Sequence, residues 1–180
     1  MNYEVKSEQE EQTTTNENPW LKPGIHEVKV TKIVATEEDG KTPRLDLTFE
    51  NREGKIATGT LYFSELAKQN STKNIGFILN AVGIKSLISG KNLTEMAKNL
   101  EKSLSGKFFR HRFVAEEIQG KEGRGNWFKA KMGFKYSTES ISTTPSKLKE
   151  LDRNNPYDYK TLAKPDSFVS GTPSSDDLPF

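Results

Sequence analysis

The sequence contains no cysteine and only two histidines among its 180 residues. Without thiols there are no disulfides, no thiol catalysis and no thiolate metal sites. Two imidazoles, at His26 and His111, are too few for a multi-histidine metal centre. No apolar run approaches the roughly 20 residues that a membrane helix needs, and the opening MNYEVKSEQEEQ lacks the apolar core of a secretory signal. We therefore expect a cytoplasmic protein with no membrane association, metal or cofactor.

Apolar residues are also scarce, at 32% of the chain, with a mean hydropathy of −0.76. Residues 1–18 and the Ser-, Thr- and Pro-rich residues from 138 onward hold too few large apolar groups to offset the entropy of ordering. The sequence predicts a disordered acidic leader over 1–18, one folded domain over 19–137, and a flexible linker with an acidic tip over 138–180.

The net charge of +2 conceals a strong asymmetry along the chain. Residues 1–23 carry −3, residues 24–136 carry +7, and residues 137–180 carry −2. A basic middle between two acidic ends indicates an anionic partner for the middle segment and a separate role for the tails.

Most of the middle segment alternates between apolar and polar residues, the pattern of half-buried strands. This pattern predicts strands over 24–34, 44–51, 55–63, 107–118 and 126–136. Apolar residues spaced at three and four predict two helices, over 74–84 and 92–104, which form a helical insert at about 73–104. Asn92 or Thr94 can cap the second helix, and Gly106 can stop it.

Three strands, a helical insert and two further strands predict a mainly β fold: a five-stranded antiparallel OB-type barrel with its helical insert between strands three and four. Disordered tails flank the barrel. A β-sandwich is the alternative architecture, and the lack of alternating strands and helices excludes a doubly wound fold.

The last predicted strand carries a tryptophan and three lysines on one face, because side chains alternate across a strand. On the preceding strand, Phe109, His111 and Phe113 share one face and two arginines the other. Cations beside a flat ring suit single-stranded nucleic acid, whose phosphates they neutralise and whose bases stack on the ring. The predicted binding residues are Trp127, Lys129, Lys131, Lys135, Arg110 and Arg112, extended by Lys121 and Arg124 in the connecting loop and by Tyr62 and Lys29 on earlier strands.

Each of these residues also has an ordinary structural interpretation. Outward lysines keep strands soluble and protect sheet edges, and Trp127 can cap the barrel. We expect Phe108, Phe109, Phe128 and Phe134 to be core residues. Trp20, in NPWLKPG, is interpreted as a clasp at the barrel base or as a base contact. We expect structural or surface roles for His26 and His111, and solvation for the acidic pair Glu116–Glu117.

The chain ends in GTPSSDDLPF, a small-residue leader followed by two aspartates, an aliphatic residue, proline and a terminal phenylalanine. The Phe180 ring suits an apolar pocket, while its carboxylate and the aspartates suit a basic rim. Pro179 restricts the backbone and lowers the entropy lost on docking. We expect a partner-binding peptide made of Asp176, Asp177, Leu178, Pro179 and Phe180.

These last residues closely resemble the acidic C-terminal tip of bacterial single-stranded DNA-binding proteins. The opening NPWLKPGIHEVKVTKI and the helical insert resemble, more loosely, phage-encoded single-stranded DNA-binding proteins of the OB type. The resemblance implies a domain that coats single-stranded DNA and a tip that recruits replication, recombination and repair enzymes in the bacterial cytoplasm, or in the host cytoplasm if the protein is phage-encoded. The acidic leader and the insert depart from the standard bacterial domain, so its tetramer interface is not carried over, and a homo-oligomer stays an open alternative.

The sequence thus predicts a sequence-independent single-stranded DNA-binding protein rather than an enzyme. It has no phosphate-binding loop, no carboxylate-clustered metal site and no nucleophile with a neighbouring base. The alternative is an adaptor that captures replication proteins through its tip without itself binding DNA. The sequence does not distinguish DNA from RNA.

Overall fold

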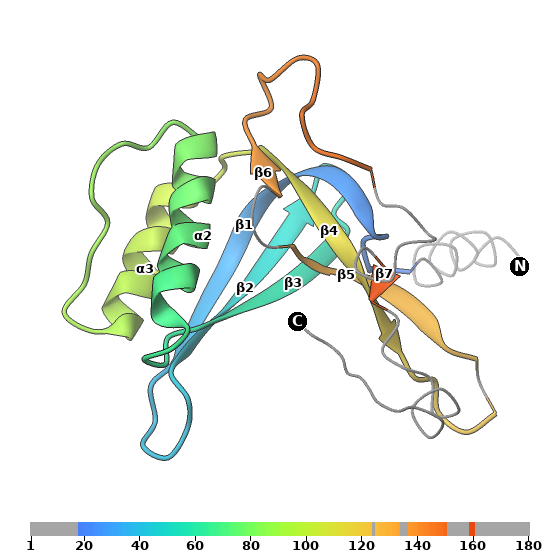
Figure 1. Cartoon of the computed structure of the whole chain (residues 1–180), viewed down its shortest axis with the longest axis horizontal. Helices are drawn as coiled ribbons and strands as arrows, with labels where there is room; N and C mark the ends of the chain where they lie inside the picture. The colour runs from blue at the N-terminus through green and yellow to red at the C-terminus, as the bar shows by residue number, and fades with distance from the viewer. Residues whose placement is uncertain (1–17, 124, 134–136, 151–158, 161–180) are drawn as a thin grey trace, which may run out of the picture.

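A computed structural model describes residues 18–123, 125–133 and 137–150, and the backbone of 159–160. The described chain is mainly β, with five long strands wrapped into a barrel and two helices outside it (Figure 1). Neither helix in these residues is long and apolar enough to cross a membrane. In chain order the elements are β1 (Gly24–Thr36), β2 (Arg44–Asn51), β3 (Ile56–Tyr62), α2 (Lys68–Ala81), α3 (Leu93–Leu104), β4 (Phe109–Ile118), β5 (Trp127–Met132), β6 (Thr138–Glu139) and β7 (Tyr159–Lys160).

The strands follow the order β1-β2-β3-β5-β4, and β4 pairs back with β1 to close the barrel. The expectation of a purely antiparallel barrel is wrong at one place, because β3 and β5 pair in parallel at Thr58 and Lys131. A ring of five strands cannot be antiparallel throughout, since an odd number of strands forces one parallel neighbour pair. The barrel is therefore mixed.

The seam between β3 and β5 is closed partly by the segment that precedes β1. The Ile56 N–H donates to Pro19 O at 2.9 Å, the Leu21 N–H to Ile56 O at 2.8 Å, and the Ala130 N–H to Leu21 O at 3.3 Å. Leu21 itself is buried. Residues 19–21, hereafter the clasp, therefore act as a short strand between β3 and β5, in agreement with the clasp interpretation of NPWLKPG.

A bulge in β1 changes which of its side chains face the core. The register with β2 shifts between Val30 and Lys32, so Ile33 is buried and Val34 is exposed. Simple alternation from Val28 and Val30 would place Val34 in the core, but it fails because one extra residue reverses the pattern beyond Val30. The Ile33 N–H donates to Glu101 Oε1 of α3 at 2.7 Å, which ties that helix to the bulge.

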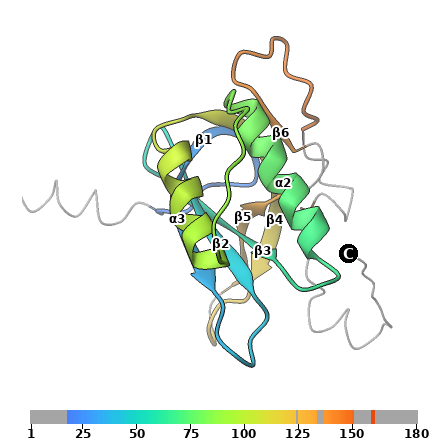
Figure 2. The same cartoon turned by 90° about the vertical axis from the view of Figure 1, so that its left-hand side faces the viewer.

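Both helices follow β3 and precede β4 in the chain (Figures 1 and 2). α3 begins where the pattern predicted: the Asn92 side chain accepts from the Glu95 N–H at 2.8 Å, and Gly106 has a φ of 72° after its end. α2 begins at Lys68, earlier than expected, because its first turns are polar and carry no apolar spacing. α3 packs on β1, and α2 lies toward β3, β4 and β6.

The barrel interior holds three phenylalanines around a histidine. Phe49, Phe109 and Phe113 are fully buried, and His111, 1% exposed, stacks on the Phe49 ring with centroids 5.7 Å apart. Burial lowers the pKa of His111 from 6.5 to about 3, so the ring is neutral. His111 Nε2 accepts from the Gly133 N–H at 3.0 Å, so Nδ1 carries the proton toward Thr138 Oγ1 at 2.7 Å. The prediction that Phe109, His111 and Phe113 share one face of β4 is confirmed, and that face points into the core.

Candidate nucleic-acid interface

The outer face of β5 carries Trp127, Lys129 and Lys131, while Ala130 and Met132 point into the core. Trp127 is 37% exposed, and both lysines are half-buried. Strand alternation therefore places this ring and these two cations on one surface, as the sequence predicted.

Trp20 of the clasp joins the same surface. Lys129 Nζ lies 4.6 Å from the centroid of the Trp20 ring, a cation–π contact. Trp20 also pairs in parallel with Ile56 of β3, which fixes its place beside β5. We call Trp20, Trp127, Lys129 and Lys131 the tryptophan–lysine surface. Trp20 is not among the binding residues predicted from the sequence, although Trp20 and Trp127 are the chain's two tryptophans.

The neighbours of this surface on β4 differ from those expected. Ile118, Glu116 and Val114 lie opposite Trp127, Lys129 and Lys131 respectively. Glu116 Oε2 lies 3.6 Å from Lys131 Nζ, so this carboxylate belongs to the surface. The expectation that Glu116 and Glu117 are both solvated is wrong for Glu117, which is buried and accepts from Asn126 Nδ2 at 2.7 Å.

The two arginines predicted for this surface lie nearer the start of β4 than the residues opposite Trp127, Lys129 and Lys131. Arg110 is paired with Glu139 of β6, and its guanidinium donates to the carbonyls of Thr143 at 3.0 Å and Ile141 at 3.2 Å. Arg112 lies opposite Ile25 of β1. Arg110 therefore anchors residues 138–143, and the structure does not bring it to Trp127.

The hydrogen bonds that Glu139 accepts also lower the pKa of its carboxyl group. Burial raises the pKa of Glu139, but hydrogen bonds from Ser146, Arg110 and the Lys147 N–H outweigh it, so the net pKa is lowered. The Glu139 carboxylate is therefore charged beside Arg110. This ion pair holds the Arg110 guanidinium within the protein, so it does not offer that charge to a ligand.

Lys29 and Tyr62 occupy other parts of the barrel exterior. Lys29 lies opposite Glu50 of β2, with Nζ 3.8 Å from Glu50 Oε1. Tyr62, 47% exposed, ends β3 opposite Arg44. Lys121 is exposed in the β4–β5 loop. Arg124, Phe134, Lys135 and the tip Asp176–Phe180 lie outside the described residues.

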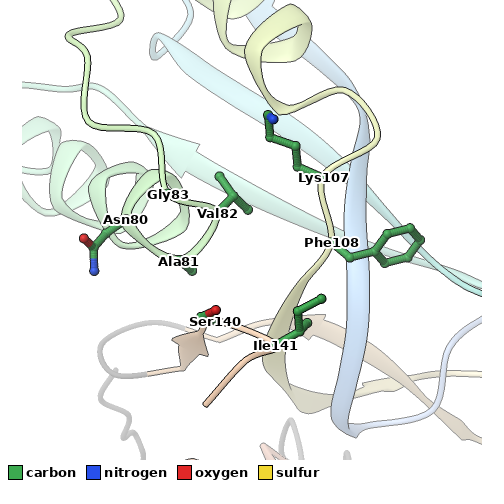
Figure 3. Close-up of a pocket in the computed structure, with 8 residues that line it drawn as sticks. All are labelled: Asn80, Ala81, Val82, Gly83, Lys107, Phe108, Ser140 and Ile141. Carbon is green, nitrogen blue, oxygen red and sulfur yellow. The ribbon is translucent and has the colours of Figure 1, made fainter.

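Two phenylalanines expected in the core lie outside it. Phe128 is 41% exposed, because the β4–β5 hairpin extends beyond the barrel, where Phe128 faces Glu117. Phe108 lies beneath Arg52, whose Cζ is 4.0 Å from the ring centroid. Phe108 also lines an open pocket of about 430 Å³ between the end of α2 and β6, but its ring points away from Val82 and Ile141 there (Figure 3).

No group of three or more His, Asp or Glu side chains that could hold a metal ion occurs in residues 18–123, 125–133 and 137–150. The described site offers two aromatic rings, two ammonium groups and one carboxylate; rings can stack on flat groups and ammonium groups can pair with anions. Neither profiles of known protein families nor the curated protein sequences searched gave a match to this chain.

Proposed function

We propose that this protein binds single-stranded DNA without sequence preference, through the tryptophan–lysine surface. Bases stack on Trp127 and Trp20, and the ammonium groups of Lys129 and Lys131 neutralise neighbouring phosphates. Stacking on a ring tolerates every base, because every base has a π-face.

The barrel itself supports this proposal. Its closed order β1-β2-β3-β5-β4, with one parallel pair and the two helices between β3 and β4 in the chain, is the arrangement that we infer to be an OB-type barrel. OB-type domains bind oligonucleotides across their barrel face and neighbouring loops. Fold alone does not assign function, so the proposal depends on the side chains.

The observation that carries the proposal is the exposure of Trp127 in register with two lysines. We expect a tryptophan that only caps the barrel to be buried, whereas Trp127 is 37% exposed and lies on the same strand face as Lys129. Lys129 in turn lies over a second indole at Trp20. Aromatic rings and cations gathered on one surface are what an unpaired nucleic-acid strand requires.

The resemblance of the C-terminal tip extends the proposal. Asp176–Phe180 would recruit replication, recombination and repair enzymes to the coated strand, as in bacterial or phage systems. This role rests on the sequence of the tip and its charge, and it is separable from DNA binding.

The proposal is tested by fluorescence anisotropy with a labelled single-stranded oligonucleotide and its duplex at two salt concentrations. Trp127→Ala should weaken single-strand binding by about 1–3 kcal/mol, the value of one stacked base. Phe128→Ala is the matched control, because it removes a neighbouring ring of similar exposure from the opposite face of β5. Its affinity should equal that of the wild type.

Two results would overturn the proposal. One is equal affinity of the wild type for single-stranded and duplex DNA. The other is an equal loss of affinity for Trp127→Ala and Phe128→Ala, which would place the contact on the hairpin as a whole and not on the tryptophan–lysine surface.

A further inference from the structure

A groove of about 550 Å³ runs between β1 and the last turns of α3. Three lysines and one glutamate are the charged residues among those that line it, and the hydroxyl of Ser105 adds a neutral donor. Lys98 and Lys102 are four residues apart, so they share one face of the helix. Lys29 approaches them from β1, on the other wall.

The glutamate in this groove, Glu101, has a structural role, because its carboxylate accepts a hydrogen bond from the backbone of β1. Its Oε1 accepts from the Ile33 N–H at 2.7 Å, at the β1 bulge. Within the described residues, no carboxylate lies within ion-pair distance of Lys98 or Lys102, and both lysines are exposed. The groove therefore presents two ammonium groups that no carboxylate of the described residues neutralises.

A continuous row of outward residues joins this groove to the tryptophan–lysine surface. Lys29 lies opposite Glu50, and Glu50 lies opposite Ile56. Ile56 pairs with Trp20, and the Trp20 ring lies beneath Lys129. Since neighbouring strands are about 4.8 Å apart, the row crosses the barrel exterior over roughly 20 Å, nearly perpendicular to the strands.

The one carboxylate in this row does not interrupt it. Glu50 Oε1 lies 3.8 Å from Lys29 Nζ, so its charge is balanced by its neighbour. A strand that stacks on the tryptophans can follow the row across β3 and β2 and then meet the ammonium groups of Lys98 and Lys102 at α3.

We propose that the groove between β1 and α3 is a second phosphate-binding site, which holds the sugar–phosphate backbone of the same DNA strand as it leaves the tryptophan–lysine surface. This inference rests on the proposed function and gives α3 a role in binding, in addition to its packing on β1. Lys98 and Lys102 hold phosphates there, and Lys29 forms the entrance to the groove. The site contributes only when the strand is long enough to span the row.

The test compares Lys98→Gln/Lys102→Gln with the wild type on oligonucleotides of about 4 and about 16 nucleotides, the limits of site size for such barrels. For the long oligonucleotide, affinity at low salt should fall on the order of tenfold, and the salt slope should decrease by about 1.4 for two lost phosphate contacts. For the short oligonucleotide, the affinity and the salt slope should both be unchanged, because this oligonucleotide is held at Trp20 and Trp127 and does not reach the groove.

Lys73→Gln/Lys85→Gln is the charge-matched control, since both lysines are exposed and neither lines the groove. It should leave both affinities unchanged, and circular dichroism melting should show that both double variants fold. An unchanged long-oligonucleotide affinity for Lys98→Gln/Lys102→Gln would overturn the groove assignment, as would a loss shared with the control.

The two proposals fail in different ways. If Trp127→Ala weakens both oligonucleotides while Lys98→Gln/Lys102→Gln weakens neither, only the groove is wrong. If the wild type binds neither oligonucleotide in preference to duplex DNA, the proposed function itself is wrong.

Discussion

His111 shows how a single residue in the barrel interior responds to pH. Its ring is enclosed by Phe49, Phe109 and Phe113, and both nitrogens are occupied. Protonation would place an uncompensated charge in this apolar interior, which is why burial lowers its pKa. The folded barrel therefore requires the neutral form of His111, with its proton on Nδ1.

Acidification should destabilise the barrel through this residue. The unfolded chain takes up the proton near pH 6.5 and the folded chain only near about 3, so stability falls as pH drops below 6.5. Between pH 7.5 and 5.0 this group should cost about 2 kcal/mol of unfolding free energy. Urea unfolding at the two pH values measures the loss.

His111→Gln keeps an acceptor for the Gly133 N–H and a donor for Thr138 but does not titrate, so the loss between the two pH values should shrink in this variant. His26→Gln, which changes a histidine at the partly exposed end of β1, should keep the wild-type loss. An equal loss in His111→Gln and wild type would contradict the assignment.

At this scale the sequence predicted which residues face outward more reliably than what they contact. Strand period alone placed Trp127, Lys129 and Lys131 on one face. It could not reveal that Arg110 is held by Glu139, because that contact depends on β6, which carries no strand pattern of its own. The contact between Trp20 and Lys129 was likewise inaccessible, since it depends on the barrel seam.

At the scale of elements, the seam between β3 and β5 depends on a glycine. A Cβ on Gly59 would lie 2.4 Å from Met132 Cβ, closer than real Cβ contacts. Residue 59 faces inward beside the parallel pair Thr58–Lys131. The two strands can approach here because residue 59 has no side chain.

Gly59→Ala should therefore destabilise the barrel by about 1–3 kcal/mol, the usual cost of overpacking. Urea unfolding monitored by circular dichroism measures the change. Gly76→Ala is the matched control: a Cβ there meets nothing within 4 Å, and in the exposed interior of α2 the exchange should stabilise by about 0.8–1 kcal/mol. Wild-type stability for Gly59→Ala would contradict the tight seam.

Strands in which apolar and polar residues alternate without interruption were predicted well. A strand in which a bulge interrupts the alternation was not. β2 alternates strictly and its bounds were predicted without error. In β1 the bulge reversed the inward phase, so Ile33 replaced Val34 in the core. The parallel pairing of β3 with β5 is not a property of either strand but of closing an odd number of them, so no local pattern could signal it.

At the scale of the whole molecule, the charge pattern separates a basic barrel from an acidic end. If the tip only recruits partners, deleting Asp176–Phe180 should leave single-strand affinity unchanged at about 0.15 M salt, where the Debye length is about 8 Å. On the proposed role of the tip, the same deletion should abolish binding to a purified replication or repair enzyme, measured by surface plasmon resonance.

Phe180→Ala is the narrower companion of that deletion, because it removes the terminal ring and leaves both aspartates in place. It too should weaken the enzyme contact while sparing DNA binding. Absence of single-strand binding in both the full chain and the deletion variant would favour the adaptor alternative, in which the barrel is only a scaffold.

The clasp imposes an order of events on the nascent chain. Residues 19–21 leave the ribosome before any barrel strand, yet they bond to Ile56 and Ala130, and the second of these emerges only after both helices and β4. Until then, β3 and the clasp keep unpaired backbone edges, which are templates for aggregation. Translation that stalls before β5 should therefore yield an aggregation-prone intermediate. The backbone edges of β3 and the clasp are fully paired only after β5 has been synthesised.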